Sequence, residues 1–164
     1  MIILSIETSC DETALSLIEA TGTFPTATYE IHGDVLWSQI DVHKEYGGVF
    51  PMLAKREHAK IIVPLLEQVL DEAGDFSTAY TPDLTPELED KIRTLLEREP
   101  GLADQLLTFH AKHGMQNVDI IAVTSGPGLE PALWVGVNFA KAIALLWEVS
   151  VVPVNHMEGH VLAS

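Results

Sequence analysis

The sequence has little cysteine and little positive charge, and each shortage excludes a class of protein. A single cysteine among 164 residues leaves no internal disulfide and fits a reducing compartment. Nine Lys and Arg stand against 24 Asp and Glu, which gives a formal net charge of −15 and a pI near 4.6. Because a field of that sign repels phosphate backbones, we expect the chain not to bind nucleic acid unaided.

Long hydrophobic runs and an export signal are also missing. The N-terminus has no basic segment, and Glu7 ends the first apolar run after six residues. The most apolar helix that we expect, residues 132–147, contains Asn138 and Lys141 and is too short to cross a bilayer. We therefore expect a cytoplasmic protein. A length of 164 residues with 47% hydrophobic content fits one compact domain or one lobe of a larger protein.

The pattern that is present, strands first and then strand–helix alternation, predicts an α/β fold. We expect strands at residues 1–6, 13–19, 118–124 and 151–154, and a third strand that ends in residues 35–40 after a loop around Gly22 and Pro25. We expect helices at 51–73, 86–99, 102–113, 131–147 and from His156 onward. Pro64 should kink or divide the helix 51–73. The helix 131–147 should bury one face, formed by Leu133, Val137, Ala140, Ala144 and Trp147.

One stretch differs in composition from the rest. Between Asp71 and Asp104 there are ten carboxylates and only three cations. We interpret residues 74–117 as an acidic helical insertion that packs on the edge of the main fold, within a single domain over residues 1–164.

Two histidines near the C-terminus are candidate metal ligands. If residues 155–160 start a helix, His156 and His160 lie one turn apart on the same face, where two imidazole nitrogens can meet one ion. The alternative is two surface histidines at a helix start. A zinc-protease motif does not fit, because Glu158 follows His156 by two residues and points away from the shared face.

Two polar turns are candidate ligand sites, each with a plain structural alternative. The turn 7–13 offers backbone N–H groups and hydroxyls to a phosphate, with Asp11 and Glu12 able to hold its metal, or it is simply a hairpin tip. The turn from Ser125 to Gly128 lies between a strand and a helix, which suits an anion or merely a tight connection. Cys10 has no nearby cation to lower its pKa, so a nucleophilic thiol is not expected. Lys55, Arg56 and His58 are interpreted as a solvated helix face.

Taken together, these segments resemble the N-terminal half of the TsaD family, the tRNA N6-adenosine threonylcarbamoyltransferases. The resemblance covers about residues 1–20, 34–73 and 118–164. It is carried by Ile6-Glu-Thr-Ser-Cys-Asp-Glu-Thr13, Ser38-Gln-Ile-Asp41 with Tyr46-Gly-Gly48, Ala122-Val-Thr-Ser-Gly-Pro-Gly-Leu129 and Val154-Asn-His-Met-Glu-Gly-His160. Each piece is weak alone, but four pieces in the same order are specific.

The resemblance implies a fold, a reaction and a set of site residues. The fold is an actin/Hsp70-like ATPase (ASKHA) lobe, with a ribonuclease-H-like mixed sheet and helices on both faces. The reaction transfers a threonylcarbamoyl group from threonylcarbamoyl-adenylate to N6 of an adenosine in tRNA, with ATP as a further candidate ligand. By the same resemblance the metal, iron or zinc, belongs to His156 and His160. The catalytic carboxylates are Asp11 and Glu12, and the ligand-binding residues are Ser9, Ser125, Gly126, Pro127 and Gly128.

The resemblance also implies partners and raises an alternative. Family transferases are longer and carry a second lobe, so we expect this chain alone to be inactive. A TsaB-type paralogue should dock on the helices 51–73 and 131–147, with a TsaE-type ATPase and tRNA as further partners and a homodimer as another assembly. The alternative function is a non-catalytic docking module of the TsaB type. Met52 departs from the family, which usually has Glu there.

Overall fold

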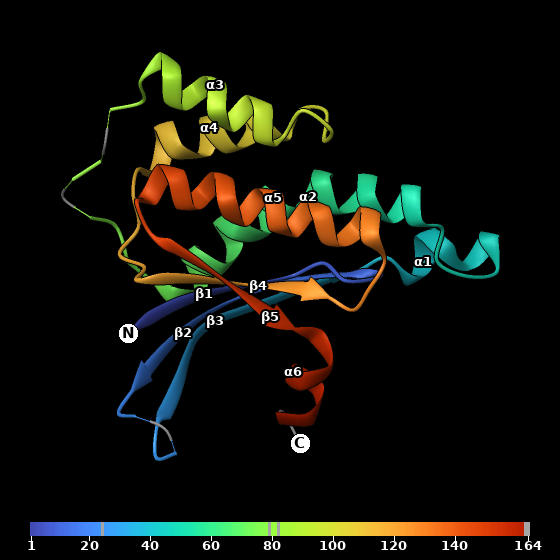
Figure 1. Ribbon diagram of the computed structural model, residues 1–164, viewed down its shortest axis with the longest axis horizontal. Coiled ribbons are helices and arrows are strands. Elements are labelled where there is room, and N and C mark those ends of the chain that lie inside the picture. The colour runs from blue at the N-terminus through green and yellow to red at the C-terminus, as the bar shows by residue number, and fades with distance from the viewer. Residues whose placement is uncertain (24, 79, 82, 163–164) are drawn as a thin grey trace.

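The computed structural model describes residues 1–23, 25–78, 80–81 and 83–162, and it is built on one five-stranded mixed sheet (Figure 1). The antiparallel part consists of β1 (Ile2–Glu7), β2 (Glu12–Thr21) and β3 (Thr28–Ser38). On the other side of β1, β4 (Ile120–Gly126) and β5 (Ser150–Asn155) continue the sheet in parallel, which gives the order β3-β2-β1-β4-β5. This confirms the predicted α/β, ribonuclease-H-like sheet.

Two long helices cover one face of the sheet. They are α2 (Pro51–Ala73) and α5 (Glu130–Trp147), and their buried side chains form one core cluster with Leu4, Leu15 and Ile121 of the strands. The short elements α1 (Ile40–His43) and η1 (Lys44–Tyr46) connect β3 to α2. On the opposite side of the sheet lies the short helix α6 (His156–Leu162), at the end of β5 (Figure 1).

The acidic segment occupies a different place from the one predicted. Its helices α3 (Pro86–Leu95) and α4 (Leu102–His113) pack on α5 and α2 as a third layer, and not on the edge of the fold (Figure 1). The reason is apolar burial, because Ile92, Leu102 and Leu106 belong to the same core cluster as α2 and α5. A bridge between Ser77 and Gln116 brings the two ends of the segment together.

Three details of the helices also differ from expectation. The helix α2 is not divided at Pro64, which rules out one of the two alternatives predicted there, and α3 ends at Leu95 instead of Glu99. In α5 the fully buried stripe contains Val135, Phe139, Ile143 and Leu146, whereas the predicted Leu133, Val137 and Ala144 are only partly buried. No helix among the described residues is long and apolar enough to cross a membrane.

Candidate functional site

The candidate site begins at the junction of β5 and α6. Asn155 ends the strand, and its side-chain Oδ1 accepts hydrogen bonds from the backbone N–H groups of Met157 (2.9 Å) and Glu158 (3.2 Å). These two groups have no partner within the helix, so the Asn155 side chain caps it and α6 starts at His156. The Asn155 cap therefore determines where α6 begins and how its first turn is oriented relative to β5.

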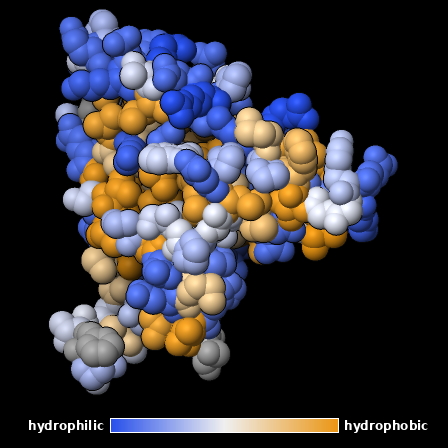
Figure 2. All heavy atoms as spheres, turned by 45° about the vertical axis from the view of Figure 1, so that its right-hand side comes forward, coloured by the Kyte–Doolittle hydropathy of each residue, from blue (hydrophilic) through white to orange (hydrophobic). Residues whose placement is uncertain are grey.

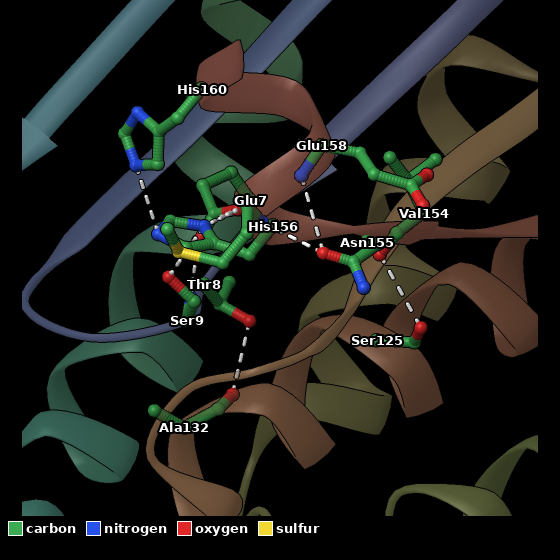
Figure 3. A network of polar contacts seen from close by, with 11 residues as sticks. Glu7, Thr8, Ser9, Ser125, Ala132, Val154, Asn155, His156, Glu158 and His160 are labelled. Carbon is green, nitrogen blue, oxygen red and sulfur yellow. Dashed lines mark hydrogen bonds and ion pairs between the residues drawn. The ribbon is translucent and has the colours of Figure 1, made fainter.

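The two histidines of α6 lie together, as their spacing predicts. The Nε2 atoms of His156 and His160 are 3.0 Å apart, and the ring centroids are 4.5 Å apart with the planes perpendicular. Glu158 extends from the other side of the helix, away from both rings (Figure 3). Neighbouring ligand atoms in a tetrahedral zinc site with bonds of about 2.0–2.1 Å are separated by about 3.3 Å, so the imidazole pair has the spacing of two ligands of one ion.

The Glu7 carboxylate and the Ser9 hydroxyl contact Nδ1 of His156, the ring nitrogen that does not face His160. Its Nδ1 lies 3.4 Å from Oε2 of Glu7 and 3.3 Å from Oγ of Ser9 (Figure 3). Because a carboxylate only accepts hydrogen bonds, Glu7 favours the tautomer with its proton on Nδ1. In that tautomer Nε2 keeps its lone pair on the side of His160, which is the arrangement that metal-binding histidines use.

Glu7 remains ionised beside His156. Burial acts to raise the pKa of Glu7, but hydrogen bonds with Ser9, Thr124 and His156 outweigh burial, and the pKa lies below its ordinary value. The backbone N–H of Ser9 donates to Oε1 of Glu7 at 2.5 Å, so the carboxylate also stabilises the turn that follows β1. The negative charge of Glu7 therefore lies next to His156, on the side of its ring opposite His160.

The turn between β1 and β2 is fastened to α5 by Thr8. The Thr8 side chain is fully buried, and its Oγ1 donates to the carbonyl of Ala132 (3.0 Å) and accepts from the backbone N–H of Gly136 (3.2 Å). Any side chain at position 136 would overlap the Thr8 hydroxyl. Gly136 thus permits the close approach of the β1–β2 turn to α5. The same turn carries Ser9, whose hydroxyl contacts His156 of α6.

The turn Ser125–Gly128 packs against the turn that contains Ser9. The backbone N–H of Leu129 donates to the carbonyl of Ser9 at 2.7 Å, and a Cβ atom at Gly128 would lie 2.6 Å from that oxygen. The Ser125 hydroxyl donates to the carbonyl of Val154 at 3.3 Å. The structure therefore brings together Ser9, this turn and α6, which are far apart in the sequence.

Comparison with known proteins identifies the family of this chain. The sequence profile of the family described as "TsaD: tRNA N6-adenosine threonylcarbamoyltransferase" matches residues 30–77 and 89–164. The chain belongs to this family. A tRNA N6-adenosine threonylcarbamoyltransferase from Thermomicrobium roseum is 38% identical over 164 residues, which is 100% of this chain and 33% of that relative. This TsaD-family chain thus spans about a third of the length of that relative.

Two solved structures share a weaker likeness. YeaZ from Pseudomonas aeruginosa is 17% identical, with a TM-score of 0.45, over 94% of this chain and 45% of that one. A protein described as having similarity to peptidase YEAZ from Pseudomonas aeruginosa is 18% identical, with a TM-score of 0.45, over 94% of this chain and 43% of that one.

The two carboxylates predicted to be catalytic lie on the same turn as Ser9. The backbone carbonyl of Asp11 accepts from the backbone N–H of Gln39 at 2.8 Å, and Glu12 is exposed at the start of β2. Within the described ranges, neither carboxylate hydrogen-bonds to a histidine of α6. Burial raises the pKa of the Cys10 thiol and neighbouring Asp11 adds to the rise, so Cys10 stays protonated, as expected.

Two of the three residues interpreted as a solvated helix face in this TsaD-family chain are not solvated. The Lys55 side chain is only 18% exposed and pairs with Glu99 at 3.1 Å. His58 is fully buried in α2, not solvated, although Arg56 beside it is exposed. Its Nε2 lies 3.1 Å from the carbonyl of Cys10, which only accepts, so Nε2 carries the proton and Nδ1 accepts from the Thr13 hydroxyl at 2.7 Å. His58 therefore supports the turn with Asp11 and Glu12 from inside the fold, and burial lowers the pKa of His58.

Glu7 was the second functional residue missed. The sequence placed it only at the end of a strand and the start of a polar turn. Its contact partner His156 is 149 residues away, so only the tertiary structure reveals the pair. A carboxylate at the end of a buried strand is the one local signal that could have singled it out.

Proposed function

We propose that this chain is the N-terminal portion of a tRNA N6-adenosine threonylcarbamoyltransferase that makes N6-threonylcarbamoyladenosine. Membership of the TsaD family supports the proposal. The structural observation that carries it is the pair of Nε2 atoms 3.0 Å apart in His156 and His160, with Glu7 behind it. Because the chain spans a third of its relative, we propose that activity needs the remainder of that length.

The histidine pair would hold the iron or zinc ion. Two neutral imidazole nitrogens suit either metal, and the Glu7 carboxylate and Ser9 hydroxyl would keep His156 in the ligating tautomer. When bound, the metal would supply Lewis-acid polarisation of phosphate or carbonyl oxygens. Glu7, already ionised in a partly buried position, would add a negative charge that favours a cation at this place.

The turns around the pair would bind the threonylcarbamoyl-adenylate, with ATP as a further ligand. We propose that Ser9, which contacts His156, and the neighbouring residues Ser125, Gly126, Pro127 and Gly128 position the ligand. Asp11 and Glu12 lie on the same turn. One of them would accept the proton that the adenosine N6 amine loses as N6 bonds to the threonylcarbamoyl carbon, while the bond from that carbon to the adenylate phosphate oxygen breaks and AMP leaves. His58 would hold these carboxylates in place through the Cys10 carbonyl and the Thr13 hydroxyl.

We propose a surface for a TsaB-type paralogue that is smaller than the full helices 51–73 and 131–147. Part of the helices 51–73 and 131–147 is covered by α3 and α4. The exposed remainder includes Met52, Trp134 and Leu145, and apolar side chains gather across this face below the hydrophilic outermost helices (Figure 2). We propose this strip as the paralogue surface, with the TsaE-type ATPase, tRNA or a second copy binding elsewhere, in the cytoplasm.

The alternative is a non-catalytic docking module of the TsaB type. Docking uses only the helix surface, so it gives no reason for an imidazole pair with an ionised carboxylate behind it. The transferase proposal explains both features.

A chimera tests the function. This chain would replace the matching third of the Thermomicrobium roseum relative, and the chimera would be assayed for N6-threonylcarbamoyladenosine in tRNA. We expect activity, and we expect His156→Ala with His160→Ala to lower it at least a hundredfold while Lys91→Ala, at an exposed position of α3, leaves it unchanged. A folded chimera without activity, or one that is indifferent to the histidines, contradicts the proposal.

A further inference from the structure

We propose that Glu19, Glu30 and His32 form a second metal site, for which zinc is the fitting ion. The three side chains lie on β2 and β3, at the end of the sheet that is far from α6. One ligand atom from each residue lies within 4.8 Å of the other two. The proposal does not depend on the transferase function, because it uses none of the residues of that site.

A bulge in the ladder between β2 and β3 assembles the cluster. Glu19 stands directly opposite Glu30, but the register then moves from Ile18–Ile31 to Leu17–Gly33. His32 is therefore an extra residue with no partner across the ladder, and bulges of this kind redirect a side chain. Here the imidazole Nε2 lies 3.3 Å from Oε2 of Glu19.

The distances and the ligand types fit zinc. A tetrahedral ion with bonds of about 2.0–2.1 Å holds its ligand atoms about 3.3 Å apart, which the His32–Glu19 pair already matches. The exposed Glu30 carboxylate, within 4.8 Å of the other two ligand atoms, would take the third position, and water would take the fourth. An imidazole in the set favours zinc over magnesium or calcium, which prefer oxygen ligands alone.

A cation would also remove an unfavourable contact. Like charges directly opposite one another on neighbouring strands destabilise a sheet, and Glu19 faces Glu30 in this way. Within the described part of the chain, neither carboxylate forms an ion pair with a lysine or an arginine. The His32 ring packs on Phe76 at a centroid distance of 5.3 Å, which holds the imidazole beside the carboxylates.

Zinc titration followed by calorimetry tests the site, with His156→Ala and His160→Ala present to remove the other pair. We expect about one zinc per chain, bound at least about tenfold more weakly after His32→Ala or Glu30→Gln. His113→Ala is the matched control and should leave the affinity unchanged. His113 pairs with Glu67 at 3.0 Å, but among the residues that the structure describes no second carboxylate joins them in a cluster.

Two results would overturn the proposal. One is the absence of saturable zinc binding in the chain that lacks both α6 histidines, and the other is an unchanged affinity after His32→Ala. If the chain without the α6 histidines fails to fold, the unsubstituted chain decides the matter. It should bind one zinc more than the His32→Ala chain, and equal stoichiometry refutes the second site.

Discussion

Single residues with close or buried contacts determine where the turn between β1 and β2 lies. Thr8 fastens it to α5, His58 supports it from α2, and Glu7 connects it to α6. Each contact joins groups that are at least 48 residues apart in the chain, so each holds the turn against a different element. Small changes at these positions should therefore affect stability and site geometry together.

Gly136→Ala should destabilise the fold by about 1–3 kcal/mol, as overpacking of a close contact does. The new methyl group would overlap the Thr8 hydroxyl, which is fully buried and bonded to Ala132. Urea unfolding measures the change. Gly48→Ala is the control, because a Cβ atom there meets nothing within 4 Å. Equal stability of the two variants would show that the turn does not need this close approach.

His58 should make stability depend on pH. Burial lowers its pKa in the folded chain, so the unfolded chain binds the proton more readily. The free energy of unfolding should consequently fall as the pH drops below the ordinary histidine pKa of about 6.5 and toward the lower folded value. Above that range the contribution is fully present.

Urea unfolding of His58→Gln at pH 7 and pH 5.5 checks this. The variant should lose about 1–3 kcal/mol at pH 7, because the Cys10 carbonyl and the Thr13 hydroxyl lose a partner, and it should show a smaller difference between the two pH values. His113→Gln serves as the control at a partly exposed position. A pH dependence as large as that of the unsubstituted chain would contradict the role given to His58.

At the scale of elements, the sequence predicted local secondary structure better than it predicted how the elements pack together. Alternation and helical periodicity predicted β1, β2, β4, β5 and the long helices, because both patterns depend on neighbours in sequence. They did not predict that β3 spans Thr28–Ser38, or that α1 and η1 follow it. They did not predict that α3 and α4 lie over α2 and α5, since an apolar stripe such as that of Ile92 does not specify its partner. The buried residues of α5 differ from the predicted stripe for the same reason, because both the sheet and α3 pack against this helix.

For the candidate site too, the sequence predicted contacts within one helix but not contacts between distant segments. The spacing of His156 and His160 predicted their approach, because both lie on one helix. Glu7 and His58 were missed because their contacts join distant segments. The roles given to Asp11, Glu12, Ser9 and the turn Ser125–Gly128 stay predictions.

An ion pair fastens the third layer to α2, and its removal should be costly. Glu99 is 1% exposed, and its Oε1 lies 3.1 Å from the Lys55 ammonium, while neither carboxylate oxygen has a hydrogen-bond partner among the described residues. Lys55→Met should destabilise the fold by about 3–5 kcal/mol, because it leaves a buried charge unpaired. Adding Glu99→Leu should recover most of that loss.

Urea unfolding of the single and double variants gives the coupling between the two side chains. Lys112→Met, which removes the exposed partner of Glu67, is the matched control and should cost less than about 1 kcal/mol. If the loss for Lys55→Met is as small as for the control, the third layer does not depend on this ion pair.

At the scale of the whole molecule, the core and the candidate metal site lie in different layers. The sheet with α2 and α5 forms the core, α3 and α4 cover that core from outside, and α6 stands on the other side with the histidine pair (Figure 1). Substitutions in α6 should therefore change the site without unfolding the molecule, because none of its described residues is buried.

The most direct test of the account is a metal count on the chain with His32→Ala, in which only the α6 pair remains as a proposed site. We predict about one zinc or iron per chain, lost when His156→Ala and His160→Ala are added while far-UV circular dichroism and the urea midpoint stay the same. A folded chain that retains no metal, or histidine substitutions that unfold the chain, would contradict the claim that α6 carries half of a metal centre.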